Sequence, residues 1–267
     1  MPIFSTNPIA QFPIGNLPLD QHFLPPGWQK HPHAWISPDD WNDAEKKQAK
    51  VIIDEQQRAL AWMSSPDDVT HAHVAKNSLM IVYPWDVLTA QERFLSTMDC
   101  DRIIGEIHAS TVIEGHLSLG NGSRILPGVF IEGHVVIGEN CKIGPNCYIR
   151  GSTSIGNRCH IGQAVEIKNS LILSNSSIGH LSYVGDSVIG KKVNFGAGTI
   201  TSNFRHDGAN HRSMIDGQLI DTGRRKFGAI IGDAVHTGIH TSIYPGRKIG
   251  PNGSTRPGDI VQHDLFC

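Results

Sequence analysis

The chain has 267 residues, and its 23 lysines and arginines nearly balance its 25 aspartates and glutamates, so the formal net charge is −2. That balance argues against binding to nucleic acid. Charged residues at 18% and hydrophobic residues at 39% indicate a folded, soluble chain, and no stretch approaches the ~18 apolar residues of a membrane span. No lysine or arginine precedes the first apolar residues, as a secretory signal would require. We therefore expect a cytoplasmic protein that binds neither nucleic acid nor membrane.

Residues 1–100 differ in composition from the rest and are expected to form a small α+β capping region. All five tryptophans lie there, whereas most glycines follow Gly105. The segment up to Pro38 is rich in proline and predicts an arm that wraps a surface.

Three regular elements are expected within this region. The sequence Ser-Pro-Asp-Asp at residues 37–40 is a typical helix start, with acidic residues in the first turn. We expect this helix to be long and to run to about Met63. A strand is expected at residues 78–83 (SLMIVY), followed by a short helix over residues 87–97.

The rest of the chain is a six-residue repeat. Neither the helical period of 3.6 nor the strand period of 2 produces such a pattern, which is the signature of a parallel β-helix. Three units close a triangular coil of 18 residues, and coils stack ~4.8 Å apart. The repeat resembles that of the hexapeptide-repeat proteins, and this resemblance implies a left-handed helix. We therefore predict a mainly β fold with a left-handed parallel β-helix over residues 101–267. Twelve consecutive positions at this spacing are isoleucine or leucine: Ile107, Ile113, Leu119, Ile125, Ile131, Ile137, Ile143, Ile149, Ile155, Ile161, Ile167 and Leu173.

The repeat slips after Leu173, breaks between about residues 204 and 228, and resumes at Ile231. We interpret residues 204–228 as a loop excursion from the β-helix, and loops of this kind are often functional. Cys141, Cys147 and Cys159 fall on the small inward position of the repeat and are expected in the core. There is no Cys-x-x-Cys pair, so neither a zinc nor a disulfide framework is indicated.

Several segments resemble one family of enzymes. GHLSYVGD (residues 179–186) and NFGAGTITSN (194–203) resemble the acetyltransferase half of the bifunctional glucosamine-1-phosphate N-acetyltransferase / N-acetylglucosamine-1-phosphate uridylyltransferases. VEIKNS (165–170) and GRRKFGAIIGD (223–233) are most similar to archaeal-type members. YPWDVL (83–88) resembles the segment that closes the nucleotidyltransferase half, but residues 1–100 hold no glycine-rich nucleotide loop. We therefore do not expect that half in this chain.

The resemblance implies an enzyme that moves the acetyl group of acetyl-CoA to the amine of an amino-sugar phosphate, such as glucosamine-1-phosphate. His180 would be the general base, Glu166 an acidic residue near it, and Asn203 a group near the reacting amine. The implied sugar-phosphate ligands are Arg150, Lys168, Tyr183 and Asn194. Ala197, Ile239 and Pro257 would lie on the coenzyme side. Separately from the resemblance, the positive charge of Arg224 and Arg225 suits the phosphates of coenzyme A, and a solvated basic turn is the alternative interpretation. Two positions depart from the bacterial pattern, since Ile239 replaces a serine and Phe204 a tyrosine.

The residue types suit these roles. Arg150 and Lys168 are 18 residues apart, which places them on adjacent coils as a clamp for one phosphate. A histidine, whose ordinary pKa is ~6.5, is suited to take a proton from an attacking amine. Glu166 would orient the ring and stabilise imidazolium.

Two other classes of function remain open. One is a non-catalytic trimeric scaffold or regulator that remains after loss of a nucleotidyltransferase half. The other is a metal enzyme like the γ-class carbonic anhydrases, with ligands among His206, His211, His236 and His240. Their spacing differs from that class, so we predict no metal. The flat faces of a prism and the family's shared sites favour a homotrimer, with a separate nucleotidyltransferase as a further partner.

Overall fold

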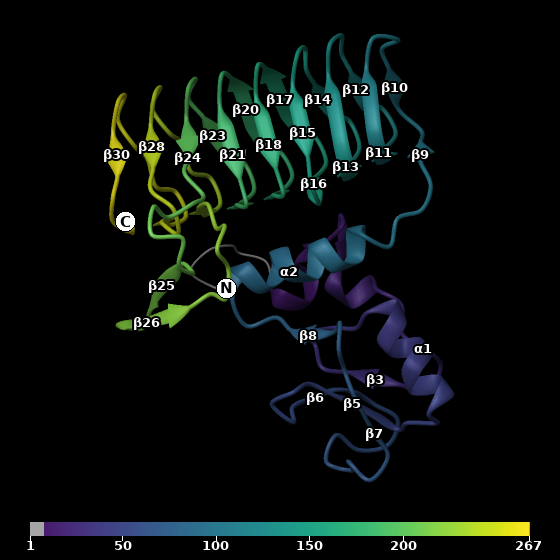
Figure 1. The fold of residues 1–267 in the computed structure, drawn as a ribbon. Coiled ribbons are helices and arrows are strands. Elements are labelled where there is room, and N and C mark those ends of the chain that lie inside the picture. Colours follow the sequence, from purple (N-terminus) through teal and green to yellow (C-terminus); the bar gives the residue numbers. More distant parts are fainter. Residues whose placement is uncertain (1–7, 267) are drawn as a thin grey trace. The chain divides into compact units, whose positions relative to one another are not determined.

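The computed structural model describes residues 8–266, which form two compact units, residues 8–94 and 95–266 (Figure 1). Each unit has its own hydrophobic core. No helix among the described residues is long and apolar enough to cross a membrane.

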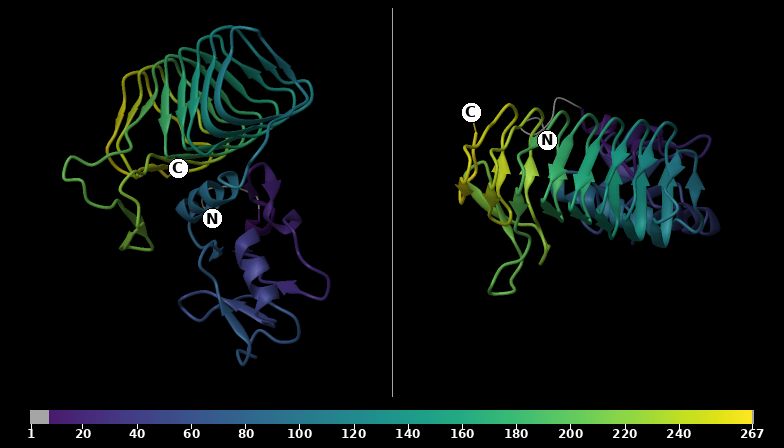
Figure 2. Two further views of the ribbon diagram at one scale, coloured as in Figure 1. Left: turned by 45° about the vertical axis from the view of Figure 1, so that its right-hand side comes forward. Right: turned by 90° about the horizontal axis from the view of Figure 1, so that it is seen from above.

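The second unit is a three-sided prism of parallel strands (Figure 2), as the six-residue repeat predicts. Its first face is a sheet of six strands that follow one another from coil to coil. These strands are β10 (Glu106–Ile107), β12 (Arg124–Ile125), β14 (Lys142–Ile143), β17 (His160–Gln163), β20 (Ser177–His180) and β23 (Asn194–Phe195).

The other two faces share a larger sheet, because the long strands β11 (Val112–Leu119) and β13 (Phe130–Ile137) pass from one face to the next. The second face continues with β15 (Tyr148–Arg150), β18 (Glu166–Lys168), β21 (Tyr183–Gly185), β24 (Ile200–Thr201), β28 (Ser242–Ile243) and β30 (Ile260–Val261). The third face holds β9 (Arg102–Ile103), β16 (Thr153–Ile155), β19 (Leu171–Ile172), β22 (Val188–Ile189), β27 (Ile230–Ile231) and β29 (Lys248–Ile249).

The interior of the prism is the stack of aliphatic side chains that the repeat predicts. Ile125, Ile143 and Ile161 lie over one another at 18-residue intervals and are at most 2% exposed. After Ile161 the next partner is Ile178, so this coil is one residue shorter and the slip in the sequence repeat is a shortened coil. The three inward cysteines, Cys141, Cys147 and Cys159, are buried as predicted.

The prism is interrupted between β24 and β27, where the chain leaves the stack. The excursion contains an antiparallel hairpin of β25 (Arg212–Ile215) and β26 (Gln218–Asp221), which projects from the prism (Figure 2). Asp216 and Gly217 both have positive φ, at 45° and 79°, as a two-residue hairpin turn requires. A bridge between Phe204 and Lys226 closes the base of the excursion.

The first unit is a small α+β structure. A four-stranded sheet has the order β3 (Gln29–Lys30), β6 (Ala59–Trp62), β5 (Val51–Ile53) and β7 (Ala72–Val74). Two further pairs are β1 (Pro13–Ile14) with β2 (Leu17–Pro18), and β4 (Ala34–Trp35) with β8 (Leu79–Met80). Short 3₁₀ turns span Ile9–Gln11 and Leu19–Gln21, and the helices are α1 (Pro38–Lys46) and α2 (Pro84–Leu95).

The long helix predicted from Ser37 to Met63 is wrong in length. It starts as predicted, since the Ser37 side chain accepts the Asp40 N–H at 3.1 Å, but it ends at Lys46. The next segment includes three consecutive β-branched residues of β5, all buried, which pack better in a strand than in a helix. The second helix begins three residues earlier than expected, and only Leu79–Met80 of the predicted strand pairs.

Candidate functional site

Two corners of the prism border the second face and position the candidate site. At the first corner, between the first and second faces, one residue per coil accepts a backbone N–H from the next coil through its carbonyl oxygen. The N–H of Gly198 donates to His180 at 3.1 Å, that of His240 to Ala197 at 2.7 Å, and that of Gly258 to Ile239 at 2.8 Å. His180, Ala197, Ile239 and Pro257 therefore form one column along this corner. The predicted base thus lies in line with the three predicted coenzyme residues.

His180 is the last residue of β20 and is exposed. Its backbone is held by two hydrogen bonds, because its carbonyl oxygen also accepts the Ser182 hydroxyl at 2.8 Å. The ring is therefore presented to solvent from a fixed backbone, next to Tyr183 at the start of the second face.

The two predicted phosphate ligands lie side by side on the second face. Arg150 and Lys168 are direct partners in the parallel pairing of β15 with β18, one coil apart. The next residue in this row is Gly185. A Cβ at Gly185 would lie 2.7 Å from Asn203 Nδ2 and would also collide with the Tyr183 hydroxyl. Because Gly185 has no side chain, the Tyr183 hydroxyl and the Asn203 amide can occupy the space next to Lys168.

Glu166 has a different partner from the one expected. Its Oε1 accepts hydrogen bonds from Nε and Nη2 of Arg150, both at 2.8 Å. Among the described residues no hydrogen bond joins Glu166 to His180. Both side chains of the Arg150–Glu166 pair are 32% exposed, so this ion pair is accessible to solvent and to a ligand.

A second ion pair lies deeper and involves a residue that the sequence reasoning missed. Lys168 Nζ lies 2.9 Å from Oδ2 of Asp186, whose side chain is 3% exposed. The same oxygen accepts a hydrogen bond from Asn203 Nδ2 at 2.6 Å, and Asn203 Nδ2 also donates to the Tyr183 hydroxyl at 3.0 Å. Three residues singled out from the sequence, Lys168, Tyr183 and Asn203, are thus joined into one network through Asp186.

Tyr183 is half-buried within this network. Burial, followed by the nearby carboxylates of Asp186 and Glu166, raises the pKa of Tyr183 above its ordinary value. Its hydroxyl is therefore protonated at neutral pH and can donate a hydrogen bond to a ligand while it accepts one from Asn203.

Three comparisons relate the chain to known proteins. The family model for the GMPPB C-terminal domain matches residues 131–252. A bifunctional sugar-1-phosphate nucleotidylyltransferase/acetyltransferase of Sulfurisphaera tokodaii is 41% identical over 182 residues, which are 68% of this chain and 45% of the relative. A bifunctional protein GlmU of Methanococcus maripaludis is 52% identical over 185 residues, or 69% of this chain and 44% of the relative. The chain is homologous to the C-terminal half of these bifunctional proteins.

The relationship agrees with the resemblance stated from the motifs. It covers about two thirds of the chain, but the chain spans less than half the length of these curated relatives. Among solved structures, the polysialic acid O-acetyltransferase OatWY is 20% identical with a TM-score of 0.29, and it covers 63% of this chain and 81% of its own. The polySia-specific acetyltransferase NeuO is 18% identical with a TM-score of 0.24, and the match covers 62% of this chain and 76% of NeuO.

Asn194 and the two arginines lie apart from the second-face network. Asn194 begins β23 on the first face, where it pairs with Ser177. Arg225 lies in the excursion, and its Nε donates to the Gly208 carbonyl at 3.0 Å, which braces that loop. Arg224 also lies in the excursion, where its carbonyl oxygen accepts the His211 N–H at 2.9 Å.

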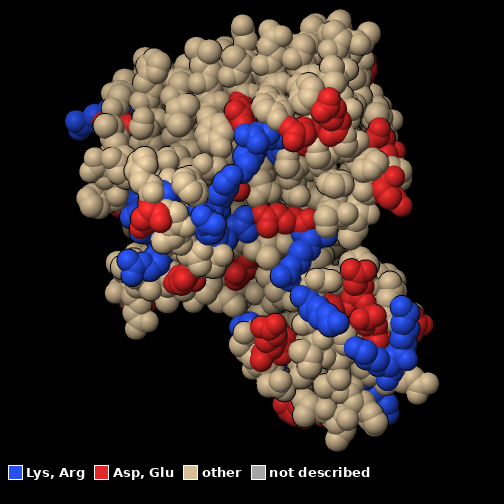
Figure 3. All heavy atoms as spheres, viewed as in Figure 1, with Lys and Arg blue, Asp and Glu red and all other residues tan. Residues whose placement is uncertain are grey.

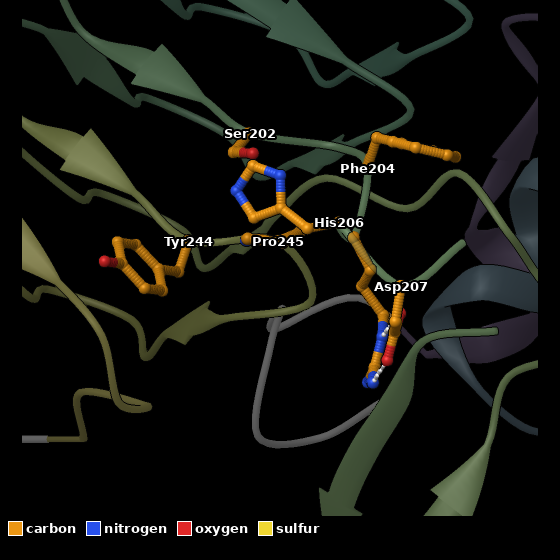
Figure 4. Close-up of a pocket in the computed structure, with 7 residues that line it drawn as sticks. Ser202, Phe204, His206, Asp207, Tyr244 and Pro245 are labelled. Atoms are coloured by element: carbon orange, nitrogen blue, oxygen red, sulfur yellow. Dashed lines mark hydrogen bonds and ion pairs between the residues drawn. The ribbon is translucent and has the colours of Figure 1, made fainter. Parts of the chain in front are cut away.

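A cavity of about 530 Å³ lies where the chain leaves the second face (Figure 4). Its lining includes Ser202 and Phe204, the two residues next to Asn203 in the chain. Phe204 is one of the positions that depart from the bacterial pattern. The excursion was singled out as functional from its break in the repeat, but the cavity itself had no sequence signal. Its lining residues are Ser202, Phe204, Arg205, His206, Asp207, Tyr244 and Pro245.

Opposite charges lie next to one another on the molecular surface (Figure 3). Ion pairs of the second unit that reach the surface include Arg124–Glu106, Arg150–Glu166 and Arg205–Asp207, whereas Lys168–Asp186 and Lys248–Asp264 are largely buried. Within residues 8–266 no group of three or more histidine, cysteine, aspartate and glutamate side chains is arranged to hold a metal ion.

Proposed function

We propose that this chain is an N-acetyltransferase that moves the acetyl group of acetyl-CoA to the amine of an amino-sugar phosphate. Glucosamine-1-phosphate is the first candidate acceptor and galactosamine-1-phosphate the second. The observation that carries the proposal is the network on the second face, which joins Lys168, Tyr183 and Asn203 beside Arg150 and the His180 corner.

Arg150 and Lys168 would hold the phosphate of the acceptor. Their backbones are one coil apart, about 5 Å along the axis, so both can reach oxygens of one phosphate. Lys168 uses one of its three ammonium protons on Asp186 and has two left for a ligand. Arg150 uses Nε and Nη2 on the partly exposed carboxylate of Glu166, which a phosphate can displace.

His180 would act as the general base. The amine nitrogen attacks the thioester carbonyl, the new C–N bond forms, and His180 takes the proton that the nitrogen loses. The tetrahedral intermediate then collapses, the C–S bond breaks, and coenzyme A leaves as a thiol after it receives that proton. Polar N–H groups near the carbonyl would stabilise the intermediate's oxyanion, and no metal is required.

Acetyl-CoA would bind along the first corner, where Ala197, Ile239 and Pro257 continue the column of His180. Ile239 is 51% exposed and offers an apolar surface to the coenzyme's pantetheine arm. Arg224 and Arg225, in the excursion, would contribute to the coenzyme's phosphates. These assignments place the thioester at the corner and the sugar phosphate on the second face.

The position of Asn194 supports a homotrimer. It lies on the first face, whereas Arg150, Lys168 and Tyr183 lie on the second. In a three-fold ring the first face of one copy can lie against the second face of the next, which would bring Asn194 to the site of its neighbour. Sedimentation should give three times 29.2 kDa, and a monomer at assay concentration would refute this arrangement.

The proposed reaction places the protein in the cytoplasm, where acetyl-CoA is available. Its product, an N-acetylated sugar-1-phosphate, is the substrate class of a nucleotidyltransferase. The Sulfurisphaera tokodaii relative combines the two activities in its name, so a nucleotidyltransferase on a separate chain is the proposed partner.

The test measures thiol release from acetyl-CoA with a panel of acceptors. The panel should hold glucosamine-1-phosphate, galactosamine-1-phosphate, unphosphorylated glucosamine and nucleotide-linked amino sugars. We expect release with an amino-sugar phosphate and at least tenfold lower kcat/KM with the unphosphorylated sugar. No release with any acceptor from a trimeric, folded protein would instead support the non-catalytic scaffold.

A further inference from the structure

We propose that Asp186 is the positioning residue of the amino-sugar-phosphate site, because its buried carboxylate fixes both the Lys168 ammonium and the Asn203 amide. The inference rests on the proposed function, and it adds a residue for which the sequence motifs implied no role. Asp186 would contact neither substrate and would act through its two partners.

Both oxygens of the Asp186 carboxylate accept hydrogen bonds. Oδ2 accepts from Lys168 Nζ at 2.9 Å and from Asn203 Nδ2 at 2.6 Å, and Oδ1 accepts from Asn169 Nδ2 at 3.0 Å. The whole residue is 2% exposed. A buried carboxylate with three donors, one of them an ammonium, is held far more rigidly than a surface side chain.

The backbone of Asp186 is fixed as well. It occupies the second corner of the prism, between the second and third faces, with φ of +49°. Aspartate tolerates this left-handed conformation better than most residues. Its N–H donates to the Lys168 carbonyl at 2.8 Å, and its own carbonyl accepts the Gly228 N–H at 2.8 Å. The backbone of Asp186 is therefore held between the coil of Lys168 and the coil that follows the excursion.

The two cations of the site consequently differ in their freedom. Arg150 is paired with Glu166, and both side chains are 32% exposed, so this pair can open when a phosphate arrives. Lys168 is 16% exposed and keeps Asp186 as its counter-ion. One cation adapts to the ligand, whereas the other holds a constant position.

Asp186 also sets the orientation of Asn203. A carboxylate only accepts hydrogen bonds, so the Asn203 NH₂ must face Asp186. The Asn203 carbonyl oxygen is then turned away from the carboxylate and is available as an acceptor for the substrate amine. An asparagine at position 186 would lose this control, because its side-chain amide can present either end to Asn203.

The decisive experiment compares Asp186→Asn with the unmodified protein in steady-state thiol release. Positioning predicts that kcat falls at least tenfold and that KM for the amino-sugar phosphate rises at least tenfold. KM for acetyl-CoA should stay within twofold. If Asp186 were only an anion near the phosphate, its neutralisation would lower the acceptor KM and leave kcat unchanged, which would overturn the proposal.

A matched control comes from the same prism. Asp264 pairs with Lys248 at 3.2 Å, with side-chain exposures of 14% and 11%, and lies outside the candidate site. Asp264→Asn should lower the melting temperature about as much as Asp186→Asn but leave all kinetic constants within twofold. Equal kinetic losses in the two variants would show that Asp186 has only a structural role.

Coupling to Asn203 supplies a further readout. If Asp186 acts through Asn203, the double variant Asp186→Asn/Asn203→Ala should have nearly the kcat of Asn203→Ala alone. Multiplicative losses in kcat would overturn that route.

If Asp186→Asn does not fold, Asp186→Glu is the second variant. It keeps the charge but displaces it by one methylene, and positioning still predicts at least a fivefold lower kcat. Unchanged kcat in Asp186→Glu would refute the proposal.

The two proposals can fail separately. If the unmodified protein neither binds nor acetylates any amino-sugar phosphate, the proposed function is overturned and the role of Asp186 with it. If the unmodified protein is active and Asp186→Asn matches it within twofold, only the role of Asp186 is overturned.

Discussion

Removal of the Lys168 ammonium is the sharpest test of the phosphate site. Lys168→Ala deletes one charge-assisted contact to the phosphate, and such a contact contributes about 1.5–3 kcal/mol. It also leaves the Asp186 carboxylate, 3% exposed, without its cation and next to the incoming phosphate. We therefore expect KM for the phosphorylated acceptor to rise at least roughly 10- to 150-fold, whereas KM for acetyl-CoA changes little.

The structure also predicts the order of two variants. Arg150→Ala should raise the acceptor KM less than Lys168→Ala, because Arg150 is 32% exposed and its partner Glu166 can be resolvated. Lys46→Ala, which removes an exposed lysine at the end of α1 in the first unit, is the control for a general loss of positive charge.

The assay is thiol release measured with each substrate varied in turn, alongside calorimetric binding of the sugar phosphate. Equal and small effects of Lys168→Ala on both substrates would refute the reasoning, since that is the behaviour of ordinary surface charges. Arg150 and Lys168 would then have no role in phosphate binding, even though the β-helix stands.

Four further predictions follow from other parts of the molecule. His180→Ala should lower kcat by ~10²–10⁴, as loss of a general base does, with an unchanged melting temperature because the side chain is exposed; near-normal kcat with a verified acceptor would exclude it as the base. Gly185→Ala should lower kcat even at temperatures where the variant is fully folded, because a Cβ at this position displaces the Tyr183 hydroxyl and the Asn203 side chain. A kcat equal to that of the parent would contradict the tight packing. Burial, with help from Lys30, lowers the pKa of His22 to about 4, so its contribution to stability is complete above pH ~6.5 and declines as pH falls from there toward 4. Between pH 7.5 and pH 5 the melting temperature of His22→Gln should therefore fall less than that of the parent. Asp40→Asn should destabilise residues 8–94, because the buried Asp40 carboxylate accepts hydrogen bonds from His73, Ser78 and the backbone of residues 76–78; an unchanged denaturant midpoint would contradict this.

The β-helix could be predicted from the sequence because its interactions are periodic. Each aliphatic residue at a sixth position meets its copy one coil later, as Ile125, Ile143 and Ile161 do. The pairing of Arg150 with Lys168 on adjacent strands follows from the same 18-residue spacing. Where a constant spacing sets a residue's neighbours, the sequence predicts both a strand and the strand with which it pairs.

The first unit shows where that reasoning ends. The pattern after residue 38 was compatible with one long helix, but Val51, Ile52 and Ile53 are buried in a strand that pairs with two others. Whether an apolar segment buries one face or both depends on segments far away in the chain, which no local pattern contains.

The candidate site shows the same division between what the sequence determines and what the tertiary structure decides. The resemblance of the motifs to a family of acetyltransferases implied roles for His180, Lys168, Tyr183 and Asn203. Only the tertiary structure paired Glu166 with Arg150 instead of His180, and only it revealed Asp186 as the carboxylate between Lys168 and Asn203. The physical reason is that Glu166 and Arg150, like Lys168 and Asp186, come from neighbouring coils, and each charged side chain turns to the opposite charge that the neighbouring coil offers. The hexad spacing fixes which strand lies next to which, but the direction of a charged side chain is decided by the donors and acceptors that folding brings within 3 Å.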